Sequence, residues 1–307
     1  MSEERSKPWR SADEHNCMWV DDTRGAFVDW ATQRWVQLTG RLVSLVEHPW
    51  LNGPAGPPDG IGTRFFEDYA ASRGLLLESG QTAGLIPNFE ALRSKDFDPG
   101  AVLPSVVDFY TRTSAYDLDA WSQWAGLFRP FGWALAMIFS RRLQQLNVPL
   151  SNLDTSRGMT SEVVSIVDPD TRQPAFTAWV RQLVATGHVI YAGAYSTCIV
   201  PEGPTPCVRV VFPLPNGNAM VLMRPIVHSD GSLSLVSAGR SFGSAGFYFT
   251  VHGPSGTAWA RYLRSLRESI HVYETAGHVR ADHDLSLWGV TFLRLHYRLR
   301  ERDAQGL

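Results

Sequence analysis

The sequence has little cysteine and little net charge, and each scarcity argues against a class of protein. Three cysteines in 307 residues, Cys17, Cys198 and Cys207, cannot build a disulfide framework. Stability is therefore expected to come from a packed core, and a reducing compartment is expected. The formal net charge of -2 leaves no electrostatic pull toward nucleic acid, so we expect no nucleic-acid partner.

Long apolar runs are also missing. The first residues, MSEERSKPWRSADEHN, are charged and lack the apolar core of a signal peptide, so we expect a cytoplasmic protein that starts near Met1. The longest apolar stretch, 125–139, is shorter than the roughly 20 residues of a spanning helix and contains Arg129 and Pro130. We expect no transmembrane segment and interpret this stretch as a buried helix.

Motifs for metal and phosphate binding are absent as well. No H-x-H or H-E-x-x-H pair occurs. The glycine-rich segment 237–247, SAGRSFGSAGF, is followed by an expected strand and not by a helix, so it is interpreted as a loop between strands. We expect no metal and no cofactor.

The N-terminal half has a helical period. Apolar residues recur every three or four positions from Phe27 to Leu45, and further helices are expected over 64–72, 101–113 and 118–146. The segment 53–62, GPAGPPDGIG, is too rich in glycine and proline for regular structure and is expected to be a loop or lid, with a flexible linker as the alternative. We expect 1–20 to be poorly ordered and 21–155 to be helical.

The apolar period changes from 3.6 to 2 after about Ser156. Strands are expected at 162–167, 175–184, 188–200, 207–215, 218–228, 233–240, 246–252, 270–275, 278–285 and 290–299, with a helix at 258–269. Asn216-Gly217 predicts a type I′ hairpin turn, and short turns at 229–231 and 275–277 favour antiparallel pairing. The expected fold is α+β: a helical N-terminal half packed on a large antiparallel bent sheet or partly closed β-barrel formed by 156–300.

The last hairpin carries the candidate acid–base chemistry. Pairing across Ala276-Gly277 predicts one face with Ile270, Val272, Val279, Ala281 and His283. The other face would then hold His271, Tyr273, His278, Arg280 and Asp282. His283 is the one titratable group in its apolar row, and it fits either a pocket acid or base or a core histidine bonded to a backbone carbonyl. The polar face, with His296 nearby, is interpreted as solvated.

Further candidate residues are more scattered. Tyr273 and Glu162 are the candidate partners of His283 in acid–base catalysis. Candidate ligand contacts are Arg209, Arg224, Trp288 and Tyr297. The two arginines flank the Asn-Gly turn, where they either hold a carboxylate or phosphate or lie exposed on the sheet. Cys198 and Cys207 are expected to be buried thiols that can oxidise if they lie opposite each other.

Three segments, FPLPNGNAMVLMRP, GRSFGSAGFYF and RADHDLSLWGVTFLRLHYRL, resemble START-type or lipocalin-like barrels in strand succession and aromatic content. The resemblance covers about half of the chain and implies a fold that encloses a hydrophobic ligand. START-type domains end in a long amphipathic helix across the sheet, whereas the last segment here is an expected strand. No functional residue is carried over from the resemblance.

Three functions follow as hypotheses. The first is binding of a hydrophobic or amphipathic small molecule or lipid in a cavity of the C-terminal sheet. The second is a cofactor-independent enzyme, a cyclase, isomerase or hydrolase, with His283 as acid or base. The third is a protein or membrane-surface interaction module that uses the tryptophan-rich half, with Trp133 and Arg141-Arg142 in peripheral membrane contact. The oligomeric state is left open.

Overall fold

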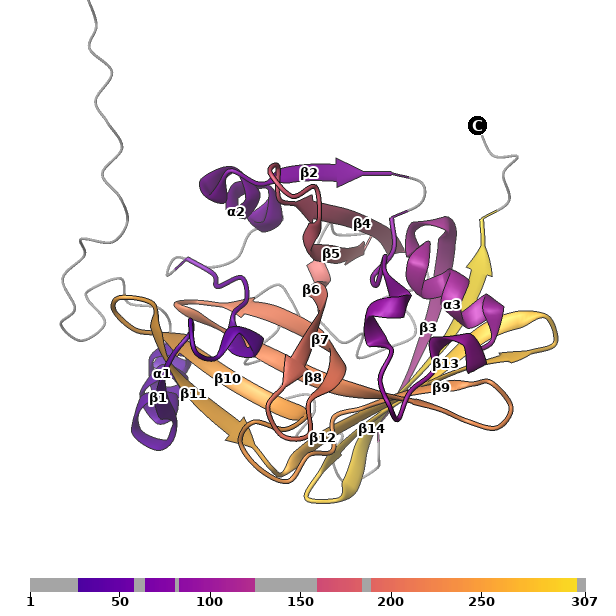
Figure 1. The fold of residues 1–307 in the computed structure, drawn as a ribbon. Helices are drawn as coiled ribbons and strands as arrows, with labels where there is room; N and C mark the ends of the chain where they lie inside the picture. Colours follow the sequence, from indigo (N-terminus) through magenta and orange to yellow (C-terminus); the bar gives the residue numbers. More distant parts are fainter. Residues whose placement is uncertain (1–26, 58–63, 81–82, 125–158, 184–188, 303–307) are drawn as a thin grey trace, which may run out of the picture.

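Antiparallel strands dominate the computed structural model, which describes residues 27–57, 64–80, 83–124, 159–183 and 189–302 (Figure 1). The α-helices in these ranges are α1 (Phe27–Thr39), α2 (Phe65–Arg73) and α3 (Pro104–Thr111), and the 3-10 helices are η2 (Pro49–Leu51), η3 (Phe89–Leu92), η4 (Pro99–Ala101) and η5 (Thr113–Ala115). The strands are β1 (Arg41–Ser44), β2 (Leu76–Ser79), β3 (Tyr116–Trp124), β4 (Met159–Val167), β5 (Pro174–Leu183), β6 (Val189–Val200), β7 (Thr205–Leu214), β8 (Gly217–Val227), β9 (Leu233–Val236), β10 (Gly246–His252), β11 (Thr257–Leu263), β12 (Leu266–Thr275), β13 (His278–Leu287) and β14 (Val290–Glu301).

All of these strands belong to one 14-stranded sheet that forks at β8. The main path runs β2-β4-β5-β6-β7-β8-β9-β12-β13-β14-β3. The first part of β8 pairs with β10, which continues through β11 to β1, whereas the last four residues of β8 pair with β9. Strand β8 therefore belongs to two branches of the sheet, one that continues through β10 and one that continues through β9.

The expected fold class is therefore wrong, because the N-terminal half contributes strands to the same sheet as the C-terminal half. Strand β3 pairs with β14, β2 pairs with β4, and β1 pairs with β11. The first part of the helix expected over 118–146 is β3, in which Asp117 and Asp119 alternate with Tyr116 and Leu118. Residues 125–146 lie outside the described residues.

Two other expected helices are also replaced by strands. Residues 258–263 form most of β11 instead of a helix, because β10 and β1 pair with its two edges and fix an extended backbone. The helix expected from Phe27 to Leu45 ends at Thr39, and β1 follows. Its predicted apolar stripe does not face the core, since Leu38 is 84% exposed while Val36 is 1% exposed.

The β7–β8 hairpin forms as predicted, but its turn is not type I′. The two connecting residues are Pro215 and Asn216, and Leu214 pairs with Gly217. Asn216 has a φ of 58°, and Gly217 is not among the residues with positive φ. Proline followed by a positive-φ residue is the type II pattern. Gly217 is instead the first residue of β8, where a Cβ atom would lie 2.0 Å from the Thr250 backbone oxygen.

Two apolar cores cover the two faces of the sheet. Residues from η3, α3 and the loops between them pack on one face against β7, β8, β13 and β14, and we call this face concave. Residues from η2 and α2 pack on the opposite face against β6, β7, β8 and β10. The loop residues 53–56 also lie against the sheet, with Gly56 bonded to Leu214 and Asn216, so this half of the expected lid is packed; residues 58–62 lie outside the described residues.

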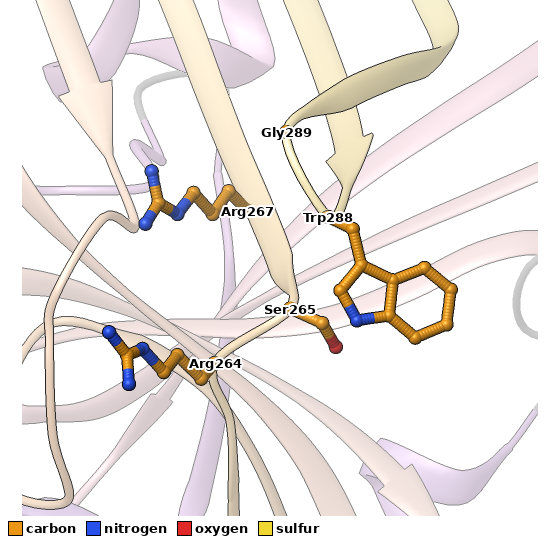
Figure 2. A pocket seen from close by; sticks show the side chains of 5 residues that line it. All are labelled: Arg264, Ser265, Arg267, Trp288 and Gly289. Atoms are coloured by element: carbon orange, nitrogen blue, oxygen red, sulfur yellow. The ribbon is translucent and has the colours of Figure 1, made fainter.

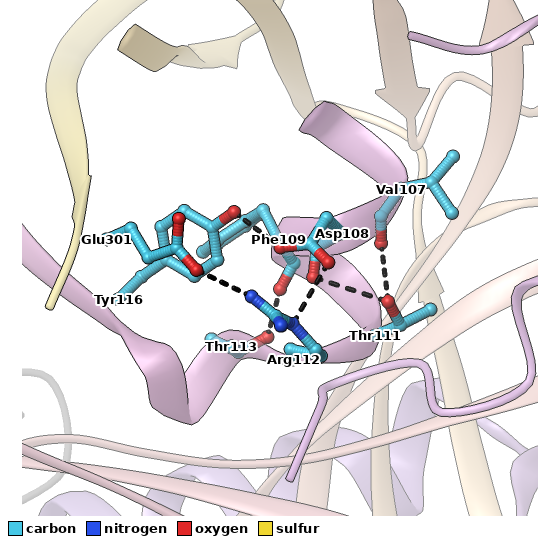
Figure 3. Close-up of polar contacts among 8 residues, drawn as sticks. All are labelled: Val107, Asp108, Phe109, Thr111, Arg112, Thr113, Tyr116 and Glu301. Carbon is cyan, nitrogen blue, oxygen red and sulfur yellow. Dashed lines mark hydrogen bonds and ion pairs between the residues drawn. The ribbon is translucent and has the colours of Figure 1, made fainter. Parts of the chain in front are cut away.

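Polar contacts fix α3 to the edge of the sheet (Figure 3). Arg112 forms ion pairs with Asp108 at 2.9 Å and with Glu301 at 2.7 Å, and the Tyr116 hydroxyl donates to Asp108 at 2.7 Å. These contacts join the helix to the start of β3 and the end of β14. The helical cover of the concave face is thereby held in place at one end.

A single hydroxyl inside this region is expected to contribute measurably to stability. The buried Thr113 Oγ1 donates to the Phe109 carbonyl at 2.7 Å and accepts the Leu85 N–H at 3.2 Å. Thr113→Val keeps the shape but leaves that buried N–H without its acceptor, so the free energy of unfolding should fall by about 1–3 kcal/mol. Urea unfolding measures the change. Thr111→Val, which removes a less buried hydroxyl, is the control and should cost less.

Candidate functional site

Six polar side chains gather on the concave face in otherwise apolar surroundings. We call them the concave cluster: Arg181 on β5, Tyr191 and Tyr195 on β6, Glu268 on β12, His283 on β13, and Tyr297 on β14. Strands β5 and β14 are seven steps apart in the sheet, roughly 34 Å if it were flat. Burial raises the pKa of the Tyr297 phenol and the nearby charge of Arg181 opposes that shift, so the sheet curls and brings the two strands close together.

Glycine and aromatic rings shape the β6 part of the cluster. The Tyr191 and Tyr195 hydroxyls are hydrogen-bonded to each other across Gly193, which lies between them on the same face of the strand. A Cβ atom at Gly193 would lie 2.9 Å from the Tyr191 hydroxyl, so glycine is what allows the ring to lie there. Trp179, opposite Gly193 on β5, packs against both rings with centroids at 5.6 and 6.1 Å.

The His283 imidazole is paired with a carboxylate. Its Nε2 lies 2.6 Å from Oε1 of Glu268, and the two side chains are only 14% and 11% exposed. The two residues are diagonal neighbours on β12 and β13, because Ile270 stands opposite His283 and Leu285 stands opposite Glu268. Tyr297 stacks near the imidazole with centroids 6.4 Å apart. The His283 imidazole thus lies within ion-pair distance of a carboxylate.

Burial and mutual charge set the electrostatics of the cluster. Burial raises the pKa of Tyr297 to about 12, and the Glu268 carboxylate adds to this effect. Burial also raises the pKa values of Tyr191 and Tyr195. Burial lowers the pKa of the Arg181 guanidinium, and the three phenols oppose that shift. At neutral pH the phenols therefore keep their protons and can donate hydrogen bonds to an oxygen-bearing group.

The last hairpin has the two predicted faces, and this separates the proposed catalytic residues. Tyr273 lies on the face opposite His283, where its hydroxyl donates to Asp282 at 3.1 Å and its ring stacks on His271. Glu162 is exposed on β4 and points away from the concave face, since its neighbour Val163 belongs to that face. Neither residue reaches His283, whereas Tyr297 does.

The two candidate arginines near the β7–β8 hairpin lie on the other face of the sheet. Arg209 is 9% exposed; it donates to Ser196 Oγ at 2.9 Å and to the Pro49 carbonyl at 3.0 Å, and so fastens η2 to the sheet. Arg224 is exposed. Cys198 and Cys207 stand opposite each other as free thiols, and burial raises the pKa of Cys198 to about 11, which keeps it protonated and unreactive.

Two motifs on the remaining surface do not form catalytic sites. Residues 239–243 read G-x-S-x-G, the spacing of a hydrolase nucleophile elbow, but Ser241 is exposed, hydrogen-bonds Glu202 at 2.8 Å and precedes strand β10 instead of a helix. The solvated face of the last hairpin pairs His296 with Asp282 at 2.7 Å. Within the described ranges no group of three or more His, Cys, Asp or Glu residues is arranged to hold a metal ion.

Trp288 lies outside the concave cluster, at the tip of the β13–β14 hairpin. It is 79% exposed and borders a surface pocket of about 330 Å³ lined also by Arg264, Ser265, Arg267 and Gly289 (Figure 2). Trp133 and the Arg141-Arg142 pair lie outside the described residues.

Sequence reasoning found His283 and Tyr297 but missed the rest of the concave cluster. Glu268 was assigned to a helix, so its register with His283 was lost. Arg181 alternates with Trp179 in β5, and the Tyr-x-Gly-x-Tyr run of 191–195 places three residues on one face of β6. This alternation was a signal that these residues share a face, but it did not show which other strand they meet.

The chain is similar to a known protein of Bacillus subtilis. A Bacillus subtilis (strain 168) protein named "Uncharacterized membrane protein YndJ" is 27% identical over 245 residues, which cover 78% of this chain and 41% of that protein. The chain thus spans about two fifths of the relative it matches. No protein-family model and no solved structure matches. None of the helices in the described part of the chain is long and apolar enough to cross a bilayer.

Proposed function

We propose that this chain binds a hydrophobic or amphipathic small molecule or lipid on the concave face of its curled sheet, with the polar end of the ligand at the concave cluster. The observation that carries the proposal is a group of six buried or partly buried polar side chains from five strands on an otherwise apolar face. A guanidinium and three protonated phenols supply donors for a carboxylate, phosphate or carbonyl oxygen. The apolar rings around them suit the rest of such a ligand.

Stability does not account for this arrangement. Burying polar groups costs free energy that hydrogen bonds only partly restore, and an apolar set of similar volume is often as stable or more stable. Groups of this kind concentrate at functional sites. The name of the Bacillus subtilis relative, a membrane protein, agrees with a lipid or another apolar ligand.

Native mass spectrometry of the purified full chain tests the proposal. We expect a bound amphipathic molecule that is released on denaturation, and Tyr297→Phe should lower its occupancy by removing a donor. Tyr273→Phe is the matched control, because it removes a hydroxyl from the opposite face of the same hairpin and should leave occupancy unchanged. A clean unliganded mass, together with no thermal shift from fatty acids or lysophospholipids, would contradict the proposal.

The pair of Glu268 and His283 gives a second test of function against structure. Glu268→Leu leaves the largely buried imidazole without its carboxylate and should reduce the free energy of unfolding by about 1–3 kcal/mol. The double variant Glu268→Leu/His283→Leu should recover that stability or exceed it, yet bind ligand more weakly. Calorimetry and ligand occupancy measure the two effects. A double variant less stable than both single variants would assign the pair a purely structural role.

A cofactor-independent acid–base enzyme is the second candidate function, favoured by the 2.6 Å contact between His283 Nε2 and the Glu268 carboxylate. A carboxylate beside an imidazole orients the ring and stabilises its protonated form. His283→Ala should then stop conversion of a bound molecule while binding continues. Equal conversion by wild type and variant would remove this candidate.

A further inference from the structure

Two neighbouring hairpin tips at one end of the sheet form a basic and aromatic surface. The β11–β12 connection consists of Arg264 and Ser265, and the β13–β14 connection consists of Trp288 and Gly289. The backbone N–H of Trp288 donates to the Ser265 carbonyl at 2.8 Å, and this hydrogen bond joins the two tips. We call these four residues and Arg267 the tip surface. It lies outside the concave cluster and plays no part in the ligand binding proposed above.

The backbone at Trp288 adopts a conformation that tryptophan rarely takes. Its φ is 50° and that of Gly289 is 83°, so both central residues have the positive φ of a type I′ turn. Asparagine and aspartate suit the first position, whereas a bulky side chain is strained there. The indole does not offset this strain by packing, since it is 79% exposed, and the following Val290 is 53% exposed. A strained and exposed tryptophan indicates a role outside the fold.

Charge accompanies the exposed ring. Arg264 and Arg267 are both exposed, and among the described residues no carboxylate lies within ion-pair distance of either guanidinium. Figure 2 shows the two arginine side chains pointing to one side of the tip and the indole projecting from the other side. A broad surface that approaches the hairpin tips end-on therefore contacts both the two guanidinium groups and the Trp288 indole.

We propose that the tip surface docks on an anionic phospholipid bilayer, with the Trp288 indole at the headgroup level and Arg264 and Arg267 paired with lipid phosphates. Tryptophan rings prefer the membrane–water interface because they combine an apolar body with one N–H donor. Guanidinium groups bind phosphate oxygens in a bidentate manner. A bilayer offers the low-polarity layer and the row of anions side by side, which a soluble phosphate does not.

The full chain should sediment with vesicles that contain phosphatidylglycerol and not with vesicles of phosphatidylcholine alone. Arg264→Gln/Arg267→Gln should weaken this binding about thirtyfold, because each basic side chain near an anionic surface contributes about fivefold to the affinity. Vesicle binding by this variant should also depend much less on the salt concentration than binding by the wild type. Arg64→Gln/Arg172→Gln, which removes two other exposed guanidinium groups, is the matched control and should change binding little.

Trp288→Asn separates docking from folding. Asn-Gly is the preferred type I′ pair, so this variant should be as stable as wild type or more stable, yet bind vesicles about tenfold more weakly. Equal binding to both vesicle types, or anionic binding unchanged by the tip variants, would overturn the proposal. Displacement of the chain from vesicles by millimolar glycerol phosphate, at constant ionic strength, would also overturn it, because the site would then take a soluble phosphate.

Discussion

Raising the pH above about 10 should unfold the protein cooperatively, because its tyrosines keep their protons in the folded state. All nine tyrosines have pKa values raised above the ordinary value, mainly by burial. Tyr297 is raised to about 12. The sequence holds only two lysines, Lys7 and Lys95. Tyrosine ionisation is therefore the main proton release that couples to unfolding in alkali.

The sign of the effect follows from proton linkage. A raised folded pKa means that the unfolded chain releases its phenol protons first, so the contribution to stability is complete below about pH 10 and is lost as the pH rises toward the folded value. Each strongly shifted tyrosine costs about 1.4 kcal/mol per pH unit in this window. Four strongly shifted phenols, those of Tyr110, Tyr191, Tyr195 and Tyr297, thus remove at most about 6 kcal/mol by pH 11, which is comparable to the whole stability of many domains.

Parallel pH titrations of tyrosinate absorbance and far-ultraviolet circular dichroism measure this. The two transitions should coincide and be steeper than a single phenol allows. Tyr297→Phe should move the midpoint to higher pH, and Tyr273→Phe, at a half-buried site outside the concave cluster, should move it less. A smooth rise of absorbance near pH 10 with an unchanged dichroism spectrum would show that the phenols are accessible and that the interior of the curled sheet is open to water.

The β half of the fold could be predicted because its alternation is clear and its turns are short. The expected strand at 246–252 has the bounds of β10, and the two faces of the last hairpin follow from pairing across Ala276-Gly277. A period of 2 assigns each residue to a face once the turn is known. For this reason the sequence predicts the face that His283 shares with Ile270, Val272, Val279 and Ala281.

The errors arose where pairing partners outweigh local preference. Residues 258–263, AWARYL, favour a helix by propensity, but pairing with strands on both edges makes them β11. The alternation in 116–124, YDLDAWSQW, marks β3 as an edge strand, and it was absorbed into a longer helical pattern. Arg181, Tyr191 and Tyr195 come near Tyr297 or Glu268 only because the sheet curls. Curvature depends on the accumulated twist of many strands and is not encoded in one segment.

Substitution of Gly217 should be among the most damaging single changes, and for a reason that the turn sequence does not suggest. A Cβ atom there would lie 2.0 Å from the Thr250 backbone oxygen and 2.9 Å from its carbonyl carbon. These atoms belong to β10, which pairs with β8 at the fork of the sheet, and backbone cannot yield as a flexible side chain can. Gly217→Ala should therefore reduce the free energy of unfolding by about 3 kcal/mol or more.

Three further variants distinguish close packing from turn conformation. If Gly217 were the second residue of a type I′ turn, Gly217→Asn would be tolerated better than Gly217→Ala, since asparagine accepts positive φ. Close approach to Thr250 predicts the reverse, because the larger side chain clashes more. Asn216→Gly, at a φ of 58°, should change stability by only a few tenths of a kcal/mol. Gly74→Ala, at a φ of 67° in open space, should reduce the free energy of unfolding by about 1 kcal/mol, which is the cost of conformational strain alone. Chemical unfolding measures this loss and the loss in Gly217→Ala. The difference between the two losses measures the close packing of β10 on β8.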